Sequence, residues 1–146
     1  MPDQSEKLNT TPVRNFLSEV ILARLATTNP SNHQPHVVPV WFEWDGESIW
    51  ISAFRSTRKL REVEKNPRVS IVVDTDERGG AARGVLFEGQ AELVTDSQII
   101  ISRSTSIYTR YLGEQGVLDP APQSWIIDPE NTLIKLKPEK VYVWGL

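Results

Sequence analysis

Apolar residues recur along this chain mostly in short β-branched and aromatic runs, and less often at the spacing of helices. The run from Ser48 to Ala53 is of the first kind, which is typical of a strand. Apolar residues three or four positions apart mark three helical stretches. The pattern predicts strands at residues 22–28, 36–44, 48–53, 69–74, 82–94, 132–136 and 141–144, and helices at residues 11–21, 58–66 and 96–112.

The order of these elements indicates the fold class. The helices are too few to join the strands as parallel βαβ units, and turn signals such as Asp45-Gly46 connect neighbouring strands as hairpins. The sequence therefore predicts a mostly antiparallel β-barrel with peripheral helices. Residues 1–10 are expected to form a disordered tail, residues 11–146 a single domain, and residues 75–81 and 113–131 loops.

The stretch from Trp50 to Val73 carries the main functional signal. A strand is followed by the hydroxyl residues Ser56 and Thr57, which are good N-caps, and then by Arg58 and Lys59 at the start of a short helix. Two cations at a helix N-terminus oppose the helix dipole unless an anion is bound there. The pattern fits an anion site and, equally well, a solvated basic turn.

Two further positions suggest special backbone environments. Pro39 interrupts the predicted strand 36–44 and removes a ladder hydrogen bond, so that strand should lie at an edge, contain a bulge or face a ligand. Gly84 and Gly89, in the predicted strand 82–94, indicate a bulge or a close backbone approach. The residues Ile99, Ile100, Ile107, Tyr108 and Tyr111 are expected to be apolar contacts of the helix 96–112.

The composition excludes several functional classes. The formal charge of −3 argues against a nucleic-acid or membrane surface, and the absence of cysteine excludes disulfides and thiolate catalysis. The two histidines, His33 and His36, are too few for a three-histidine zinc site, and no metal is expected. A polar N-terminus without a spanning segment predicts a cytoplasmic protein. No residue stands out as a catalytic acid, and a strand histidine such as His36 is more often only hydrogen-bonded than an acid or base.

Four segments resemble a known superfamily: QPHVVPVWFEWDG, SIWIS, RSTRKLREVEKNPRVSIVV and GVLFEGQAELV. They are similar to the pyridoxamine 5'-phosphate oxidase-like superfamily of split β-barrel proteins, which bind FMN or, in one branch, the deazaflavin coenzyme F-420. The resemblance implies an FMN-binding split antiparallel barrel over residues 11–146. It also implies a homodimer with the cofactor at the interface and a small-molecule substrate.

The resemblance also implies roles for individual residues. The family's phosphate-binding basic pair corresponds to Arg58 and Lys59. The hydroxyls that add phosphate hydrogen bonds correspond to Ser56 and Thr57, and the phosphate or ribityl contacts correspond to Ser52 and Ala53. The backbone that faces the ring corresponds to Val38, Pro39, Val40 and Trp41.

The chain departs from the true oxidase in three places. The oxidase has cations on the strand that matches His36 to Trp41, a glutamine where Gly84 stands, and a longer C-terminal segment. A flavin- or deazaflavin-dependent oxidoreductase acting on a small organic substrate is therefore favoured over pyridoxamine phosphate oxidation. The alternative is a non-catalytic protein that stores or senses FMN or haem.

Overall fold

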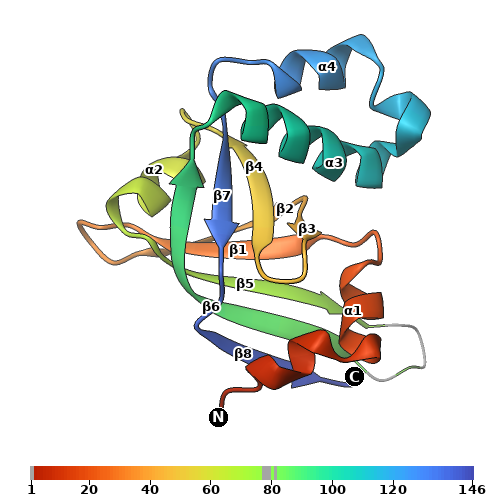
Figure 1. The fold of residues 1–146 in the computed structure, drawn as a ribbon. Helices are drawn as coiled ribbons and strands as arrows, with labels where there is room; N and C mark the ends of the chain where they lie inside the picture. Colours follow the sequence, from red (N-terminus) through yellow and green to blue (C-terminus); the bar gives the residue numbers. More distant parts are fainter. Residues whose placement is uncertain (1, 77–79, 81) are drawn as a thin grey trace.

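The structure is a computed structural model that describes residues 2–76, 80 and 82–146 (Figure 1). The loop expected at residues 75–81 therefore lies largely outside the described residues. The elements in chain order are η1 (Ser5–Asn9), α1 (Thr11–Leu17), β1 (Ala23–Thr28), β2 (Pro35–Val40), β3 (Glu43–Trp44), β4 (Ile49–Phe54), α2 (Arg58–Lys65), β5 (Arg68–Thr75), β6 (Arg83–Val94), α3 (Ser97–Gly116), α4 (Pro120–Ile126), β7 (Asn131–Leu136) and β8 (Lys140–Trp144).

All strand pairings among the described residues are antiparallel. The sheet runs in the order β2-β1-β5-β6-β7-β4-β3, and β8 pairs with β6 outside this path. β6 changes partner along its length, because residues 84–88 pair with β8 whereas residues 91–94 pair with β7. Figure 1 shows the sheet curled into a half-barrel, with α1 at one end and α3 and α4 at the other. The predicted fold class, mainly β with a split antiparallel barrel and peripheral helices, is confirmed.

Two hydrophobic clusters hold these layers together. The larger cluster fills the curled sheet, and β5 contributes Val69, Ile71 and Val73 to it at the alternating spacing of a strand. Leu60 and Val63 bury the inner face of α2 in the same cluster, as the helical spacing predicts. The second cluster lies between the β4–β7 pair and the helices α3 and α4, and consists of Trp50, Ile100, Ile107, Tyr108, Val117, Ile126 and Leu133.

The strand expected at residues 36–44 is divided, but at another place than Pro39. β2 ends at Val40 and β3 begins at Glu43, while Pro39 lies within β2 opposite Arg24. β2 is an edge strand that pairs with β1, and an edge strand is the place in a sheet where proline is tolerated. The expectation of an edge strand is confirmed.

The prediction of a loop at residues 113–131 is wrong over part of this range. Residues Pro120–Ile126 form the helix α4, which follows the N-cap residue Asp119. Prolines read as loop markers, yet Pro120 and Pro122 stand in the first turn of this helix. There the missing N–H groups would have no helical partner in any case.

The tail expected to be disordered differs from the structure over residues 2–10. Asp3 Oδ1 accepts the amide of Val141 and Gln4 Oε1 accepts the amide of Val143, both at 2.8 Å, so the tail satisfies the exposed edge of β8. η1 follows, and Leu8 is buried in the main core. The polar composition of the tail suggested disorder, but the side chains of Asp3 and Gln4 accept hydrogen bonds from β8 instead of being solvated.

Gly84 shows the close approach that the sequence predicts. The ring of Trp144 lies over it, and a Cβ added to Gly84 would stand 2.1 Å from Cζ2 of that ring. A side chain at residue 84 would therefore displace Trp144 from β8.

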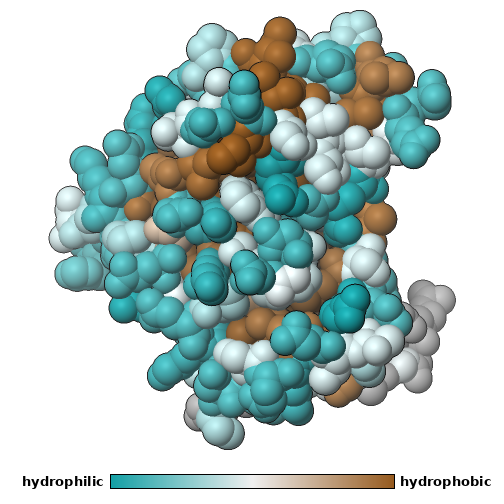
Figure 2. All heavy atoms as spheres, viewed as in Figure 1, coloured by the Kyte–Doolittle hydropathy of each residue, from teal (hydrophilic) through white to brown (hydrophobic). Residues whose placement is uncertain are grey.

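Hydrophobic residues also reach the surface. On the face shown in Figure 2 they gather in a band that runs from the α4 end of the molecule toward α2. None of the described helices combines the length and the apolar character needed to cross a bilayer.

Candidate functional site

The site begins where β4 ends and α2 starts. Thr57 occupies the N-cap position, but its Oγ1 donates back to the carbonyl oxygen of Phe54 at 2.7 Å. Ser56 Oγ donates to the carboxylate of Glu130 at 3.2 Å. Neither hydroxyl caps α2, so the first amides of this helix have no side-chain acceptor among the described residues. A helix start of this kind attracts an anion.

Lys59 points from the first turn of α2 into a cavity. Its side chain is partly buried, and burial lowers the pKa of its ammonium group because the charged form loses water. No carboxylate of the described chain lies within ion-pair distance of its Nζ. A partly buried cation without a partner is costly, unless a ligand supplies the opposite charge.

Two hollows at Lys59 share four of their lining residues, and we call the two together the aromatic cleft. They measure about 370 and 260 Å³, and both are lined by Trp41, Ser52, Lys59 and Tyr108. The remaining lining residues are Leu22, Pro39, Val40 and Ile107 in the first part, and Ala53, Phe54, Thr57 and Trp125 in the second.

Aromatic rings from three elements form the walls of the cleft. Trp41, after β2, stacks on Tyr111 of α3 with ring centroids 4.8 Å apart and planes 4° apart. Tyr108 meets Trp41 edge-on at 5.8 Å and Trp125 of α4 edge-on at 6.0 Å. The hydroxyl of Tyr111 is fixed by donating to the Ile21 carbonyl at 2.7 Å. Such rigid rings suit a planar ligand.

A short chain of hydrogen bonds fixes the polar atoms inside the cleft. Ser52 Oγ donates to Asn131 Oδ1 at 2.8 Å, so the Tyr108 hydroxyl is the donor in its 2.9 Å contact with Ser52. Burial raises the pKa of Tyr108, although the hydrogen bond to Ser52 acts in the opposite direction. Tyr108 is therefore a neutral phenol at physiological pH, with oxygen lone pairs available to a ligand.

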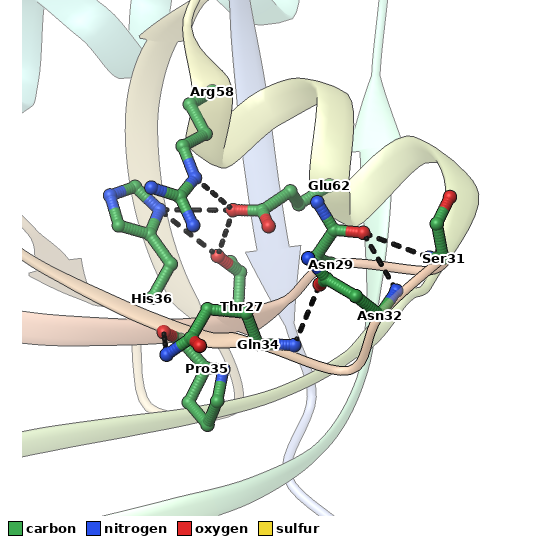
Figure 3. A network of polar contacts seen from close by, with 9 residues as sticks. All are labelled: Thr27, Asn29, Ser31, Asn32, Gln34, Pro35, His36, Arg58 and Glu62. Atoms are coloured by element: carbon green, nitrogen blue, oxygen red, sulfur yellow. Dashed lines mark hydrogen bonds and ion pairs between the residues drawn. The ribbon is translucent and has the colours of Figure 1, made fainter.

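Arg58 is not among the residues that line the aromatic cleft, and its side chain points toward a polar cluster (Figure 3). Its Nε lies 3.2 Å from Glu62 Oε1, which is also 3.0 Å from His36 Nδ1 and 3.1 Å from Thr27 Oγ1. Glu62 is buried, and α2, β1 and β2 thus meet at one carboxylate oxygen. Arg58 and Ser56 line a separate surface hollow of about 460 Å³ beside the turn at Asn29.

The structure therefore divides the residues that the sequence singles out. It brings Pro39, Val40, Trp41, Ser52, Ala53, Thr57 and Lys59 together around the aromatic cleft. It places Ser56 and Arg58 at the other hollow, and Val38 against the main core. The basic pair splits because consecutive side chains on a helix point in directions about 100° apart.

Sequence reasoning missed the part of the cleft wall that α3 and α4 contribute. Tyr108 and Ile107 were assigned only to packing, and Trp125 fell in an expected loop. The aromatic content of the helix 96–112 was the available signal, but the strand that this helix faces depends on tertiary packing.

Comparison with known proteins identifies related folds. A family model described as pyridoxamine 5'-phosphate oxidase matches residues 10–145. A conserved hypothetical protein from Mycobacterium tuberculosis superposes with a TM-score of 0.75 and 22% identity, over 99% of this chain and 85% of that chain. An F420 reductase superposes with a TM-score of 0.70 and 24% identity, over 88% of this chain and 94% of that chain. HutZ, the haem storage protein of Vibrio cholerae, superposes with a TM-score of 0.73 and 24% identity, over 90% of this chain and 92% of that chain. No curated protein matches the chain.

Proposed function

The chain belongs to the pyridoxamine 5'-phosphate oxidase family, and from this premise we propose that it binds FMN or a deazaflavin in the aromatic cleft. We propose further that it is an oxidoreductase that transfers a hydride between this cofactor and a small organic substrate. The observation that carries the proposal is the partly buried Lys59, which has no ion-pair partner among the described residues, beside the start of α2, which no side chain caps there.

The residues of the cleft fit such a cofactor. Its larger part, at about 370 Å³, already has the size of an ordinary small-molecule pocket. One end offers a cation and free amides to a phosphate, and the walls offer aromatic faces to a planar ring. β2 contributes Pro39, and this strand has a sheet partner on one side only among the described residues. A charged phosphate and a flat ring therefore find matching surroundings in a single cleft.

The chain's own groups have distinct tasks in this proposal. Lys59 and the first amides of α2 hold the phosphate, while Trp41 and Tyr108 confine the ring and exclude water. The bound flavin-type cofactor supplies the hydride chemistry, so the protein needs no strong acid or nucleophile of its own. Tyr108, kept neutral by burial, presents oxygen lone pairs to a polar edge of the cofactor or the substrate.

One observation disfavours pyridoxamine phosphate oxidation, and another disfavours haem binding. β2 exposes Pro35, Val37 and Pro39, and its histidine, His36, is directed at Glu62. The strand therefore offers no free cation to a second phosphorylated molecule. Neither histidine lines the aromatic cleft, which also disfavours haem ligation there.

Binding tests the cofactor site first. Lys59→Met should lower the affinity for FMN and for the deazaflavin by about tenfold or more, because a charge-assisted contact to phosphate is lost. Lys65→Met is the matched control, since Lys65 is an exposed lysine at the other end of α2. Fluorescence titration measures both. Equal affinities for Lys59→Met and the wild type would contradict the proposed site.

Turnover tests the reaction. Reduced cofactor on the wild-type protein should be reoxidised at a rate that depends on an added acceptor such as a quinone, and stopped-flow absorbance follows this rate. Tight binding with no acceptor-dependent rate, over a panel of conjugated acceptors, would favour storage or sensing instead.

A further inference from the structure

Three hydroxyl side chains of the described chain line the aromatic cleft, and each has given its proton to an acceptor within the protein. Thr57 Oγ1 donates to the Phe54 carbonyl oxygen at 2.7 Å. Ser52 Oγ donates to Asn131 Oδ1 at 2.8 Å, and the Tyr108 hydroxyl donates to Ser52 Oγ at 2.9 Å. A hydroxyl has one proton and two lone pairs. Toward a ligand, these three oxygens therefore present lone pairs and no proton.

Asn131, the first residue of β7, sets the direction of the chain of hydrogen bonds that links β4 and α3. Its side chain is buried, and its Nδ2 donates to the Ile126 carbonyl oxygen at 3.1 Å and to Ser104 Oγ at 3.0 Å. The Ile126 carbonyl can only accept, so the nitrogen of the Asn131 amide must face it. The oxygen of the same amide then faces Ser52 and requires a proton from it.

Reversing this chain would leave a buried oxygen without a donor. If Ser52 turned its proton toward Tyr108, Asn131 Oδ1 would lose the donor that it has among the described residues. A buried acceptor without a donor carries the full cost of its lost water. Burial also raises the pKa of Tyr108, so the phenol keeps the proton that it donates to Ser52. The fold therefore stabilises the order in which Tyr108 donates to Ser52 and Ser52 donates to Asn131.

We infer that Asn131, acting through Ser52 and Tyr108, makes the hydroxyl side of the aromatic cleft selective for a ligand group that donates a hydrogen bond, such as N–H or O–H. A carbonyl or ether oxygen placed against Tyr108 would meet lone pairs and would lose its water without compensation. Lys59 and the first amides of α2 are the donors that take the anionic group of the same ligand. The cleft thus fits a planar anion that also carries N–H or hydroxyl groups.

The inference rests on the proposed function and states which part of a bound molecule can lie against Tyr108. A flavin-type cofactor carries hydroxyls on its sugar-alcohol chain and an N–H on its ring, and these groups donate. Its ring carbonyls and its phosphate oxygens only accept. The first set suits the hydroxyl side of the cleft, whereas the second set requires other surroundings.

Pairs of ligands that differ in one atom test the preference. Indole carboxylates with the acid on the benzene ring are planar anions, and each positional isomer has a benzofuran counterpart in which an oxygen acceptor replaces the N–H donor. At least one indole should bind the wild-type protein about fivefold more tightly than its counterpart. In a cleft without a free acceptor the benzofuran would bind better, because the indole N–H would lose its hydrogen bond to water.

NMR titrations that follow the amide signals of Ser52 and Lys59 give both dissociation constants. Three results would each overturn the inference: equal binding within every pair, tighter binding of the benzofurans, or no binding of any indole carboxylate at millimolar concentration.

Two variants show whether Tyr108 is the acceptor and whether its proton is committed. Tyr108→Phe removes the accepting oxygen and should abolish the preference for the indole. Ser52→Ala keeps this oxygen but frees its proton, so Tyr108 can donate and the preference should shift toward the benzofuran. A wild-type preference that persists in either variant would overturn the inference.

A third variant tests the role of Asn131 as a positioning residue. Asn131→Leu frees the Ser52 proton to turn toward Tyr108 and should lower the preference about as much as Ser52→Ala does. Ser104→Ala is the matched control, because it removes one acceptor of the same amide nitrogen and keeps the Ile126 carbonyl that orients the amide. Ser104→Ala should retain the wild-type preference. An unchanged preference in Asn131→Leu with a native circular dichroism spectrum would overturn the inference, and Ser52→Ala decides if Asn131→Leu does not fold.

Probes without a flavin ring separate this inference from the proposed function. If no flavin binds but the indole preference holds and is lost in Tyr108→Phe, the proposed cofactor is wrong and the ligand preference stands. If flavins bind through Lys59 but the indole and benzofuran pairs bind equally, the proposed cofactor site stands and the inference is wrong.

Discussion

At the scale of single residues, α2 places two adjacent cations in opposite situations. Arg58 compensates a buried carboxylate, so it contributes to the folded state before any ligand arrives. Lys59 has no recorded partner in the described chain and stands in a partly buried cleft, where its charge is a cost. Arg58 therefore stabilises the folded protein. Lys59 lowers the stability of the folded protein but favours ligand binding, as functional residues often do.

Lys59→Met should not destabilise the cofactor-free protein at neutral pH, and we expect a change within about 0.5 kcal/mol or a gain. Burial lowers the pKa of Lys59 from 10.5, so at alkaline pH the unfolded state binds more protons than the folded state. The contribution of Lys59 to the free energy of unfolding of the wild type therefore rises as pH increases through the lowered native pKa of this residue. Any advantage of Lys59→Met should shrink over the same interval. Urea unfolding at several pH values measures it, and a clear loss of stability at neutral pH would indicate a structural role.

Arg58→Ala should lower the free energy of unfolding by about 1 kcal/mol, because buried Glu62 loses one of its three donors. Arg61→Ala removes an exposed arginine of the same helix and serves as the control. Thermal and urea unfolding of the cofactor-free proteins should rank them in this order. Equal stabilities would mean that solvent replaces the guanidinium at Glu62.

At the scale of elements, the sequence predicts what local patterns determine. The strands and the packing of Leu60 and Val63 follow from the spacing of apolar residues, and α3 starts after Asp96, whose side chain accepts the amides of Gln98 and Ile99. The anion-binding half of the site is local in the same sense, because it is a strand end followed by a helix start. The aromatic half is not local. Tyr108 and Trp125 reach the cleft only through the packing of α3 and α4 on the sheet, which no short window of sequence encodes.

The turn between β3 and β4 gives a pH-dependent test at this scale. Burial alone would raise the pKa of Asp45, but hydrogen bonds from the Trp50 indole and the amides of Ser48 and Glu47, together with Arg103, lower it from 3.8. A carboxyl with a lowered native pKa stabilises the fold above 3.8 and loses that contribution as pH falls through the native value.

Asp45→Asn should therefore cost about 1–2 kcal/mol at neutral pH, because Asn cannot accept the indole and both amides as a charged group does. The difference from the wild type should shrink as pH falls below 3.8 and be lost only below the lowered native pKa of Asp45. Chemical unfolding from acid to neutral pH checks both parts, and a constant difference across this range would contradict the assignment. Asp128→Asn, at a turn whose carboxylate accepts a single amide, is the comparison.

At the scale of the whole molecule, the aromatic cleft opens onto an unusually apolar edge. β2 has a free side, and Val37 on it is 64% exposed. Leu22 and Pro39, both solvent-accessible, continue this surface into the cleft lining. A free strand edge with apolar side chains invites pairing or aggregation unless something covers it. A second copy placed there would also close the mouth of the cleft, as expected for a homodimer with the cofactor at its interface.

We therefore expect a homodimer that buries β2, with an interface above about 1,200 Å² in total. Val37→Glu should convert it to a monomer at micromolar concentration, because a carboxylate would lose its water at the centre of the contact. Leu118→Glu is matched in exposure, at 64%, but lies at the far end beside α4 and should leave the dimer intact. Light scattering gives the mass of each variant, and flavin titration of the Val37→Glu protein should show weaker binding through the opened cleft. A monomeric wild type would refute the dimer, whereas a dimer that survives Val37→Glu but not Leu118→Glu would move the interface to the α3–α4 end.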